Sequence, residues 1–109
     1  MNQVNTFFSS NKSSFSLRGA VGSTYAKNNV VLMPKNGVPG AQGTLNALQL
    51  DNSGLNGAVS TIATGLNNPT SVTLYNNNIF VPNSQLGYLF GYETGSLPLP
   101  FTVSIIPYN

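Results

Sequence analysis

Few residues in this sequence can carry acid–base or metal chemistry. The 109 residues include no histidine and no cysteine, which excludes a Ser–His or Cys–His nucleophile pair and a zinc site with imidazole or thiolate ligands. The only carboxylates are Asp51 and Glu93. Glycoside hydrolysis requires two carboxyl groups that flank one bond, and calcium requires about six to eight oxygen ligands. We therefore expect that the chain by itself is not an enzyme.

The local sequence around each carboxylate favours a structural role. Asp51 begins the stretch "DNSG", which is typical of a turn because Asp and Asn bond to nearby backbone groups and Gly accepts positive φ. Glu93 follows an apolar stretch, "GYLFGY", and is interpreted as a solvated charge at the end of a strand. Neither environment indicates a catalytic acid.

The tyrosines are the other candidates for a functional site. Tyr75, Tyr88 and Tyr92 could provide stacking surfaces for a sugar or another ligand. Because their spacing is even, Tyr88 and Tyr92 are expected to share one face of a strand at 88–92. They are the candidate ligand-binding residues, and packing against a neighbouring sheet is the competing interpretation.

The low charge content separates this chain from most soluble domains. Charged residues make up 6% of the sequence and apolar residues 40%, with a mean hydropathy of +0.01, against about 25% charged residues in an average domain. Asn, Ser and Thr supply the polarity, as in many secreted or assembling proteins. The basic residues are scattered rather than clustered, so nucleic-acid binding is not expected. They are Lys12, Arg18, Lys27 and Lys35.

No targeting or membrane segment is evident in the sequence. The N-terminal stretch "MNQVNTFFSSNKSSFSLRG" lacks the apolar run of a secretory signal. No segment approaches the 18 or so apolar residues of a membrane span. The composition resembles that of extracellular proteins, but without a signal peptide it assigns no compartment, and the absence of cysteine leaves the redox environment open.

The positions of the candidate residues depend on strands, because no long segment has helical periodicity. Residues 71–75 alternate between apolar and polar, three asparagines follow at 76–78, and Ile79-Phe80-Val81 returns, which predicts a β-hairpin with a three-residue connection. Pro and Gly are spread along the chain and argue further against helices. We predict an all-β fold. The expected strands are 30–33, 45–50, 59–63, 71–75, 79–81, 88–92 and 101–106.

Two parts of the sequence resemble each other. "NNVVLMPKNG" (28–37) is similar to "NNIFVPNSQ" (77–85), "GTLNALQLD" to "GYLFGYETG", and "AVSTIA" to "TVSII". A period of about 40–50 residues with four short strands is typical of β-propeller blades. The pattern predicts a first blade at 15–64 and a second at 65–109, and the Asn/Ser-rich residues 1–14 are expected to form a flexible lead. The pattern also places Asp51 and Glu93 on adjacent blades rather than together.

The stretch "IATGLNNPTSVTLYNNNIFVPNSQLGYLF" (62–90) resembles a repeat of the NHL kind and the blades of regucalcin/gluconolactonase-like six-bladed propellers. The resemblance consists of Gly65-Leu66, Pro69 before an alternating strand, the Asn turn, the triplet at 79–81 and Leu89. Such propellers commonly carry Asp after the apolar strand, where this chain has Asn83. The resemblance implies that Asn83, and less strongly Asp51, contributes a metal ligand. No cofactor is expected for the chain alone, whereas a complete propeller could bind Ca²⁺.

About two blades cannot close a propeller ring, which needs about four to eight. The expected partners are therefore further blades, either in a longer parent chain or in a homotrimer. Contacts between blades are expected through Val72, Leu74, Ile79 and Val81.

These expectations favour a non-catalytic structural and binding scaffold. One alternative is part of a metal-dependent lactonase or hydrolase whose other blades carry the catalytic residues. The second is a structural subunit of a filament, capsid or coat, with the fold of a small β-sandwich or jelly roll.

Overall fold

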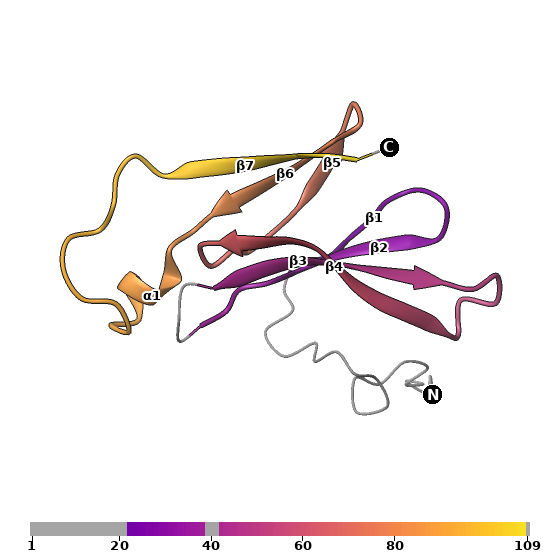
Figure 1. Cartoon of the computed structure of the whole chain (residues 1–109), viewed down its shortest axis with the longest axis horizontal. Helices are drawn as coiled ribbons and strands as arrows, with labels where there is room; N and C mark the ends of the chain where they lie inside the picture. Colours follow the sequence, from indigo (N-terminus) through magenta and orange to yellow (C-terminus); the bar gives the residue numbers. More distant parts are fainter. Residues whose placement is uncertain (1–21, 39–41, 109) are drawn as a thin grey trace, which may run out of the picture.

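The protein consists of two antiparallel β-sheets that lie face to face (Figure 1). The computed structural model describes residues 22–38 and 42–108; the predicted lead at 1–14 lies outside them. The predicted all-β class is confirmed. In each sheet, strands that are consecutive in sequence are also neighbours, so both sheets are simple meanders.

The first sheet has the order β1-β2-β3-β4 and the second the order β5-β6-β7. The predicted strands overlap β2 to β7, with the exception of 88–92. The strands are β1 (Thr24–Tyr25), β2 (Val30–Lys35), β3 (Gly43–Leu50), β4 (Gly57–Leu66), β5 (Thr73–Tyr75), β6 (Asn78–Asn83) and β7 (Thr102–Pro107), and one helical turn, α1, spans Leu86–Leu89.

The prediction of a strand at 88–92 is wrong. The chain instead forms α1 and then a turn in which the N–H groups of Tyr92 and Glu93 both donate to the carbonyl oxygen of Gly87, at 2.8 and 3.0 Å. Gly91, with φ of 78°, permits this reversal of direction. Local backbone hydrogen bonds therefore replace the ladder that the apolar pattern indicated.

The hairpin between β5 and β6 has a two-residue loop rather than the predicted three-residue connection. Tyr75 pairs with Asn78, so only Asn76 and Asn77 lie between the strands. Their φ angles are 52° and 63°. Two consecutive positive φ values are the signature of a type I′ turn, which Asn tolerates and which matches the twist of the flanking strands.

The same turn recurs between β1 and β2. Asn28 and Asn29 have φ of 59° and 63°, and the N–H of Val30 donates to the carbonyl oxygen of Lys27 at 3.3 Å. From Asn28 to Asn76 the offset is 48 residues (76 minus 28). Pro34 and Pro82, near the ends of β2 and β6, are separated by the same 48 residues (82 minus 34). The first two strands of each sheet therefore repeat.

The repeat continues differently from the sequence alignment. The third strand of the second sheet is β7, which pairs with β6 as β3 pairs with β2. The segment "TVSII", in β7, is therefore the counterpart of β3. The segment "GYLFGYETG", which the alignment had matched to β3, forms no strand. The connection between the second and third strands spans 36–42 in the first sheet and 84–101 in the second.

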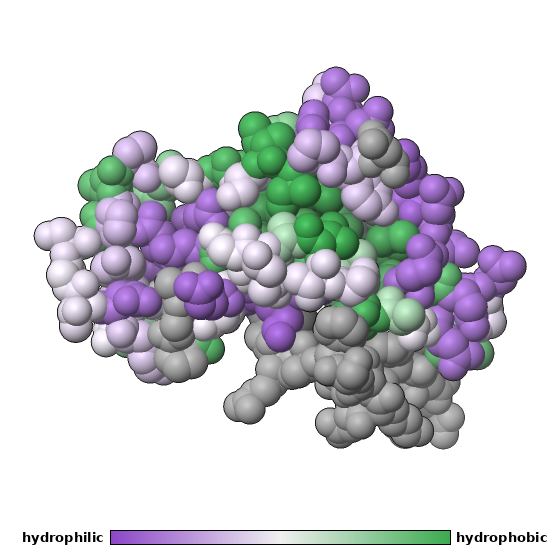
Figure 2. All heavy atoms as spheres, viewed as in Figure 1, coloured by the Kyte–Doolittle hydropathy of each residue, from purple (hydrophilic) through white to green (hydrophobic). Residues whose placement is uncertain are grey.

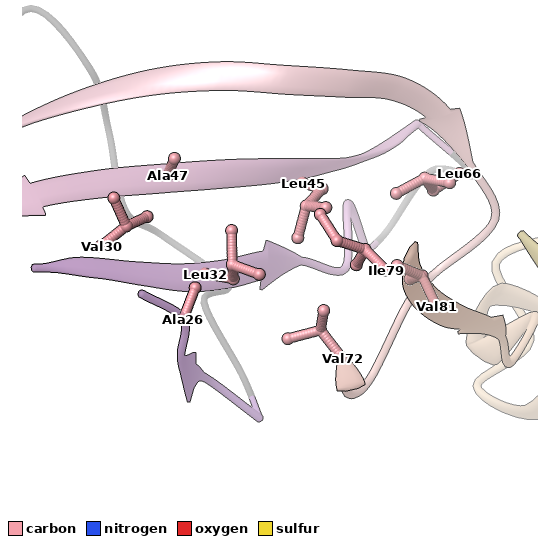
Figure 3. Close-up of a cluster of buried hydrophobic side chains, with 9 residues drawn as sticks. All are labelled: Ala26, Val30, Leu32, Leu45, Ala47, Leu66, Val72, Ile79 and Val81. Carbon is pink, nitrogen blue, oxygen red and sulfur yellow. The ribbon is translucent and has the colours of Figure 1, made fainter. Parts of the chain in front are cut away.

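A single apolar core joins the two sheets (Figure 3). Ile79 and Val81 are fully buried, Val72 is 6% exposed, and Leu74 packs against the same cluster. The sequence predicted these four residues at contacts between blades; in the structure they belong to, or pack against, the core between the two sheets. The remaining members come from the first sheet and the segments next to it: Ala26, Val30, Leu32, Leu45, Ala47 and Leu66.

The opposite face of the first sheet carries a second, smaller cluster. Met33, Leu48 and Val59 are buried there, and Val31 and Leu50 pack against them. The two central strands of the first sheet thus have apolar side chains on both faces.

The single short helix of the described residues is far from the length and hydrophobicity of a membrane-spanning helix.

Candidate ligand-binding site in the 84–101 connection

The connection between β6 and β7 carries a cavity that its own residues line. Gln85, with φ of 53°, turns the chain out of β6 and into α1. The segment then passes Gly91 and Gly95, both with positive φ, and returns to β7. Figure 1 shows this connection as the extended loop at one end of the molecule, beside α1.

The buried amide of Asn68 attaches α1 to the first sheet. Its Nδ2 donates to the carbonyl oxygen of Asn36 at 2.7 Å, and its Oδ1 accepts from the N–H of Gly87 at 2.9 Å. Asn68 is fully buried. One side chain thus joins the β2–β3 connection to the β6–β7 connection.

Gly87 packs closely beneath Glu93. A Cβ atom on Gly87 would lie 2.8 Å from Cγ of Glu93 and 3.5 Å from Oδ1 of Asn68. Real Cβ atoms essentially never approach a neighbour this closely, so any larger residue at 87 displaces Glu93. The glycine therefore sets the position of the only carboxylate in this region.

Asn83 fixes the base of the connection. Its Oδ1 accepts from the N–H of Asn67 at 2.9 Å. Its Nδ2 donates to the hydroxyl oxygens of Thr102 and Ser104, at 3.0 and 2.9 Å. The residue is 8% exposed. The side chain proposed as a metal ligand therefore uses its polar atoms to hold the two ends of the connection together.

A cavity of about 430 Å³ lies within this connection. Every lining residue belongs to 84–101, so the cavity is built by the connection alone. Its walls combine aromatic, aliphatic and polar side chains, which is the usual composition of a small-molecule site. The lining residues are Ser84, Gln85, Tyr88, Leu89, Glu93, Gly95, Leu97 and Phe101.

Gln85 connects the two sides of the cavity. Its Nε2 donates to the carbonyl oxygen of Pro98 at 3.1 Å, which holds the returning segment against the start of the connection. Its Oε1 is buried and has no hydrogen-bond donor among the described residues. An unsatisfied buried carbonyl is uncommon and usually marks a water, an ion or a functional role.

The structure separates the two candidate tyrosines. Tyr88 lines the cavity and is half-buried. Tyr92 is 57% exposed and does not line it. The strand face that was expected to unite them does not form, because α1 and the following turn occupy that segment.

Asp51 lies in the predicted turn and is fully exposed. Its Oδ1 accepts from the hydroxyl of Ser53 at 2.6 Å and from the N–H groups of Ser53 and Gly54 at 3.0 and 3.1 Å. Its Oδ2 accepts from Nδ2 of Asn56 at 3.3 Å. The hydrogen bond from the Ser53 hydroxyl is the main cause that lowers the pKa of Asp51 below its ordinary value of 3.8.

The two suggested metal ligands are not brought together. Asp51 follows β3 and Asn83 ends β6, at opposite ends of the molecule (Figure 1). No group of three or more His, Cys, Asp or Glu residues capable of holding a metal occurs within 22–38 and 42–108.

Sequence reasoning missed the residues that build the site. No spacing rule connects Asn68 with Gly87, because their contact depends on how the two connections meet in space. Phe101 was assigned to a strand, whereas it precedes β7 and lines the cavity. The one usable signal was the extra length of the 84–101 segment relative to 36–42.

The sequence matches no protein-family model, and no curated protein or solved structure matches it.

Proposed function

We propose that this chain is a non-catalytic binding scaffold in which two repeated sheets hold the 84–101 connection and its cavity. Repeated β-architectures commonly keep a constant framework and place their binding residues in connections of variable length. The framework here is the pair of Asn-turn hairpins with their shared core.

The observation that carries this proposal is the unequal length of the two equivalent connections. In the first sheet, only residues 36–42 separate β2 from β3. In the second sheet, residues 84–101 add α1 and the whole cavity lining. A longer connection is not needed to join two antiparallel strands, so the extra residues are free to serve binding.

The chemistry of the lining favours binding over catalysis. Glu93 is its only carboxylate, and the hydroxyl of Ser84 is engaged with that of Thr70 at 2.8 Å. A nucleophile activated by a neighbouring base is therefore not among the lining groups. Aromatic and aliphatic walls around a few polar groups provide affinity without a reaction.

The finer proposal is that the two sheets are blade-like units of an NHL/gluconolactonase-like propeller, completed by further blades of a longer chain or by other copies. The meander order of both sheets and their face-to-face packing support it. Among the described residues the second sheet has three strands, so a fourth strand equivalent to β4 would have to come from outside them.

A fragment library screened by ¹H–¹⁵N NMR tests the binding function. We expect hits that shift the amide signals of the cavity lining, Tyr88 and Leu97 among them. The variant Tyr88→Ala is expected to weaken such hits several-fold. The matched variant Tyr92→Ala, which alters an exposed tyrosine outside the lining, is expected to leave them unchanged. A screen with no hits in 84–101 would contradict the proposal.

A further inference from the structure

We propose that the cavity binds a small ligand that carries an ammonium group on an apolar body. This inference rests on the proposed binding function and names the chemical class of the ligand. It is derived from the charge, the hydrogen-bonding capacity and the shape of the lining.

The charge of the lining favours a cationic ligand. Glu93 is the only charged residue of the lining, and it is half-buried. Among the described residues it forms neither an ion pair nor a side-chain hydrogen bond. A cationic ligand is therefore attracted to this carboxylate and an anionic ligand is repelled.

The hydrogen-bonding groups of the lining favour a ligand that donates. The amide nitrogen of Gln85 is occupied by the carbonyl oxygen of Pro98. Its oxygen, in a residue that is 5% exposed, is left without a donor. That oxygen is itself inaccessible to solvent, so the side-chain groups of the lining that can accept from a ligand are the Glu93 carboxylate and the Tyr88 hydroxyl. An ammonium group provides three donors and no acceptor, which complements them.

The apolar wall of the cavity favours a ligand with an apolar body. Tyr88 and Phe101 contribute aromatic rings, and Leu89 and Leu97 contribute aliphatic surface. Phe101 and Leu89 are 55% and 74% exposed, so the wall can still lose water when a ligand covers it. Aromatic faces also attract cations directly, by about 0.5–2 kcal/mol. A volume of about 430 Å³ lies within the range of small-molecule sites.

The test compares three probes of similar size and different charge: 2-phenylethylammonium, 2-phenylethanol and phenylacetate. Each is titrated into the ¹⁵N-labelled chain at neutral pH, and Kd is obtained from amide shifts in 84–101. We expect the ammonium probe to bind at least tenfold more tightly than the alcohol, and phenylacetate to bind more weakly than both.

Two charge-neutralising variants locate the effect. Glu93→Gln, which is nearly isosteric, is expected to remove the preference for the ammonium probe over the alcohol. Asp51→Asn removes the other carboxylate, in the β3–β4 turn, and is expected to keep that preference. The amide spectrum of each variant shows directly whether the fold is retained. Phe101→Leu is the second variant at the site, and it is expected to weaken the ammonium and alcohol probes together.

The outcomes test the ligand class and the binding function separately. If the alcohol binds as tightly as the ammonium probe, or if Glu93→Gln keeps the preference, the ligand class is wrong. If no probe shifts the lining while other fragments do, the ligand class is again wrong and the binding function stands. If no fragment of any kind shifts the lining, the binding function itself is wrong.

Discussion

Buried side-chain amides hold the candidate site in place. Asn68 joins the β2–β3 connection to the β6–β7 connection, Asn83 closes the base of the β6–β7 connection, and Gln85 spans the cavity. Each amide carries donors and an acceptor, so one side chain can satisfy backbone groups on two segments at once. The Asn-rich composition, which suggested only an uncharged surface, therefore also supplies the internal framework of the site.

Asn68→Ala is expected to be among the most destabilising single substitutions at the site. It removes the Asn68 partner from the partly buried carbonyl oxygen of Asn36 and from the buried N–H of Gly87, and each such loss costs about 1–3 kcal/mol. We expect a decrease of about 3 kcal/mol in the free energy of unfolding, measured by urea denaturation. Asn52→Ala, in an exposed turn, is the control and is expected to change it by about 0.5 kcal/mol or less.

Asp51 gives the stability of the chain a dependence on acid pH. Its pKa is lowered in the folded state, chiefly by the Ser53 hydroxyl. A lowered pKa means that the folded state prefers the ionised carboxylate. The stabilisation is therefore present above the unfolded pKa and is lost as pH falls through the folded pKa. The group is fully exposed, so the effect is small.

The comparison of wild type with Asp51→Asn isolates this contribution. We expect the difference in urea midpoint to be constant between about pH 5 and 7 and to shrink as pH falls below about 4. A difference that grows on acidification would contradict the assigned role of the Ser53 hydrogen bond.

At the scale of elements, the two hairpins are the units that the chain repeats. Each has an Asn-Asn pair with both φ angles positive, and each leads into a strand with a proline near its end. Asn is among the residues that tolerate the left-handed region, whereas a Cβ-branched or bulky side chain there is strained. The turns therefore specify the register of β1–β2 and β5–β6.

Equivalent substitutions in the two turns should have equivalent effects. Asn77→Ala places alanine at a φ of 63° and is expected to destabilise the chain by about 1 kcal/mol, whereas Asn77→Gly is expected to stabilise it slightly. Asn29→Ala and Asn29→Gly, at the same φ of 63°, should behave alike. Thermal unfolding of the four variants provides the measurement. Opposite signs at the two turns would show that the hairpins are not equivalent.

The sequence predicted elements whose signal is local and missed those whose cause is distant. The period-two pattern of 71–75 and the apolar triplet at 79–81 identified the hairpin and its inward residues, because a strand shows its buried face in its own spacing. Residues 88–92 also look like a strand. They form a helical turn instead, because Gly87 is hydrogen-bonded elsewhere. Its N–H donates to Asn68, and its carbonyl oxygen accepts from the N–H groups of Tyr92 and Glu93.

The candidate site was predictable only in part, for the same reason. Tyr88 was identified by its type, and it lines the cavity. Gln85 and Phe101 line it too, but their roles come from the return path of 95–101 towards β7. That path has no periodic signature in a segment rich in Gly and Pro.

At the scale of the whole molecule, β7 is an edge strand of the second sheet. Val103 and Ile105 of β7 are 56% and 60% exposed, and Figure 2 shows apolar side chains gathered over this sheet. The N–H of Tyr108 donates to the carbonyl oxygen of Asn77. Because backbone groups alternate along a strand, those of Val103 and Ile105 point to the free edge.

This edge lacks the usual protection against pairing with another chain. β7 contains no charged residue, and its one proline, Pro107, is the last residue of the strand. Charged side chains and interior prolines are the devices by which natural edge strands prevent association. Among the described residues, an edge of this kind, next to exposed β-branched side chains, is the expected place where a further strand adds to the sheet.

Ile105→Lys is therefore expected to reduce self-association of the chain. The charge would have to be buried or repelled when another strand pairs with β7, so the mass in solution by light scattering should shift towards 11.5 kDa, the mass of one chain. Leu55→Lys is the matched control, because Leu55 is 56% exposed and lies in the β3–β4 turn. A wild-type mass above that of one chain that falls only with Ile105→Lys would support assembly through this edge. A wild type that is already monomeric would contradict assembly of this chain alone.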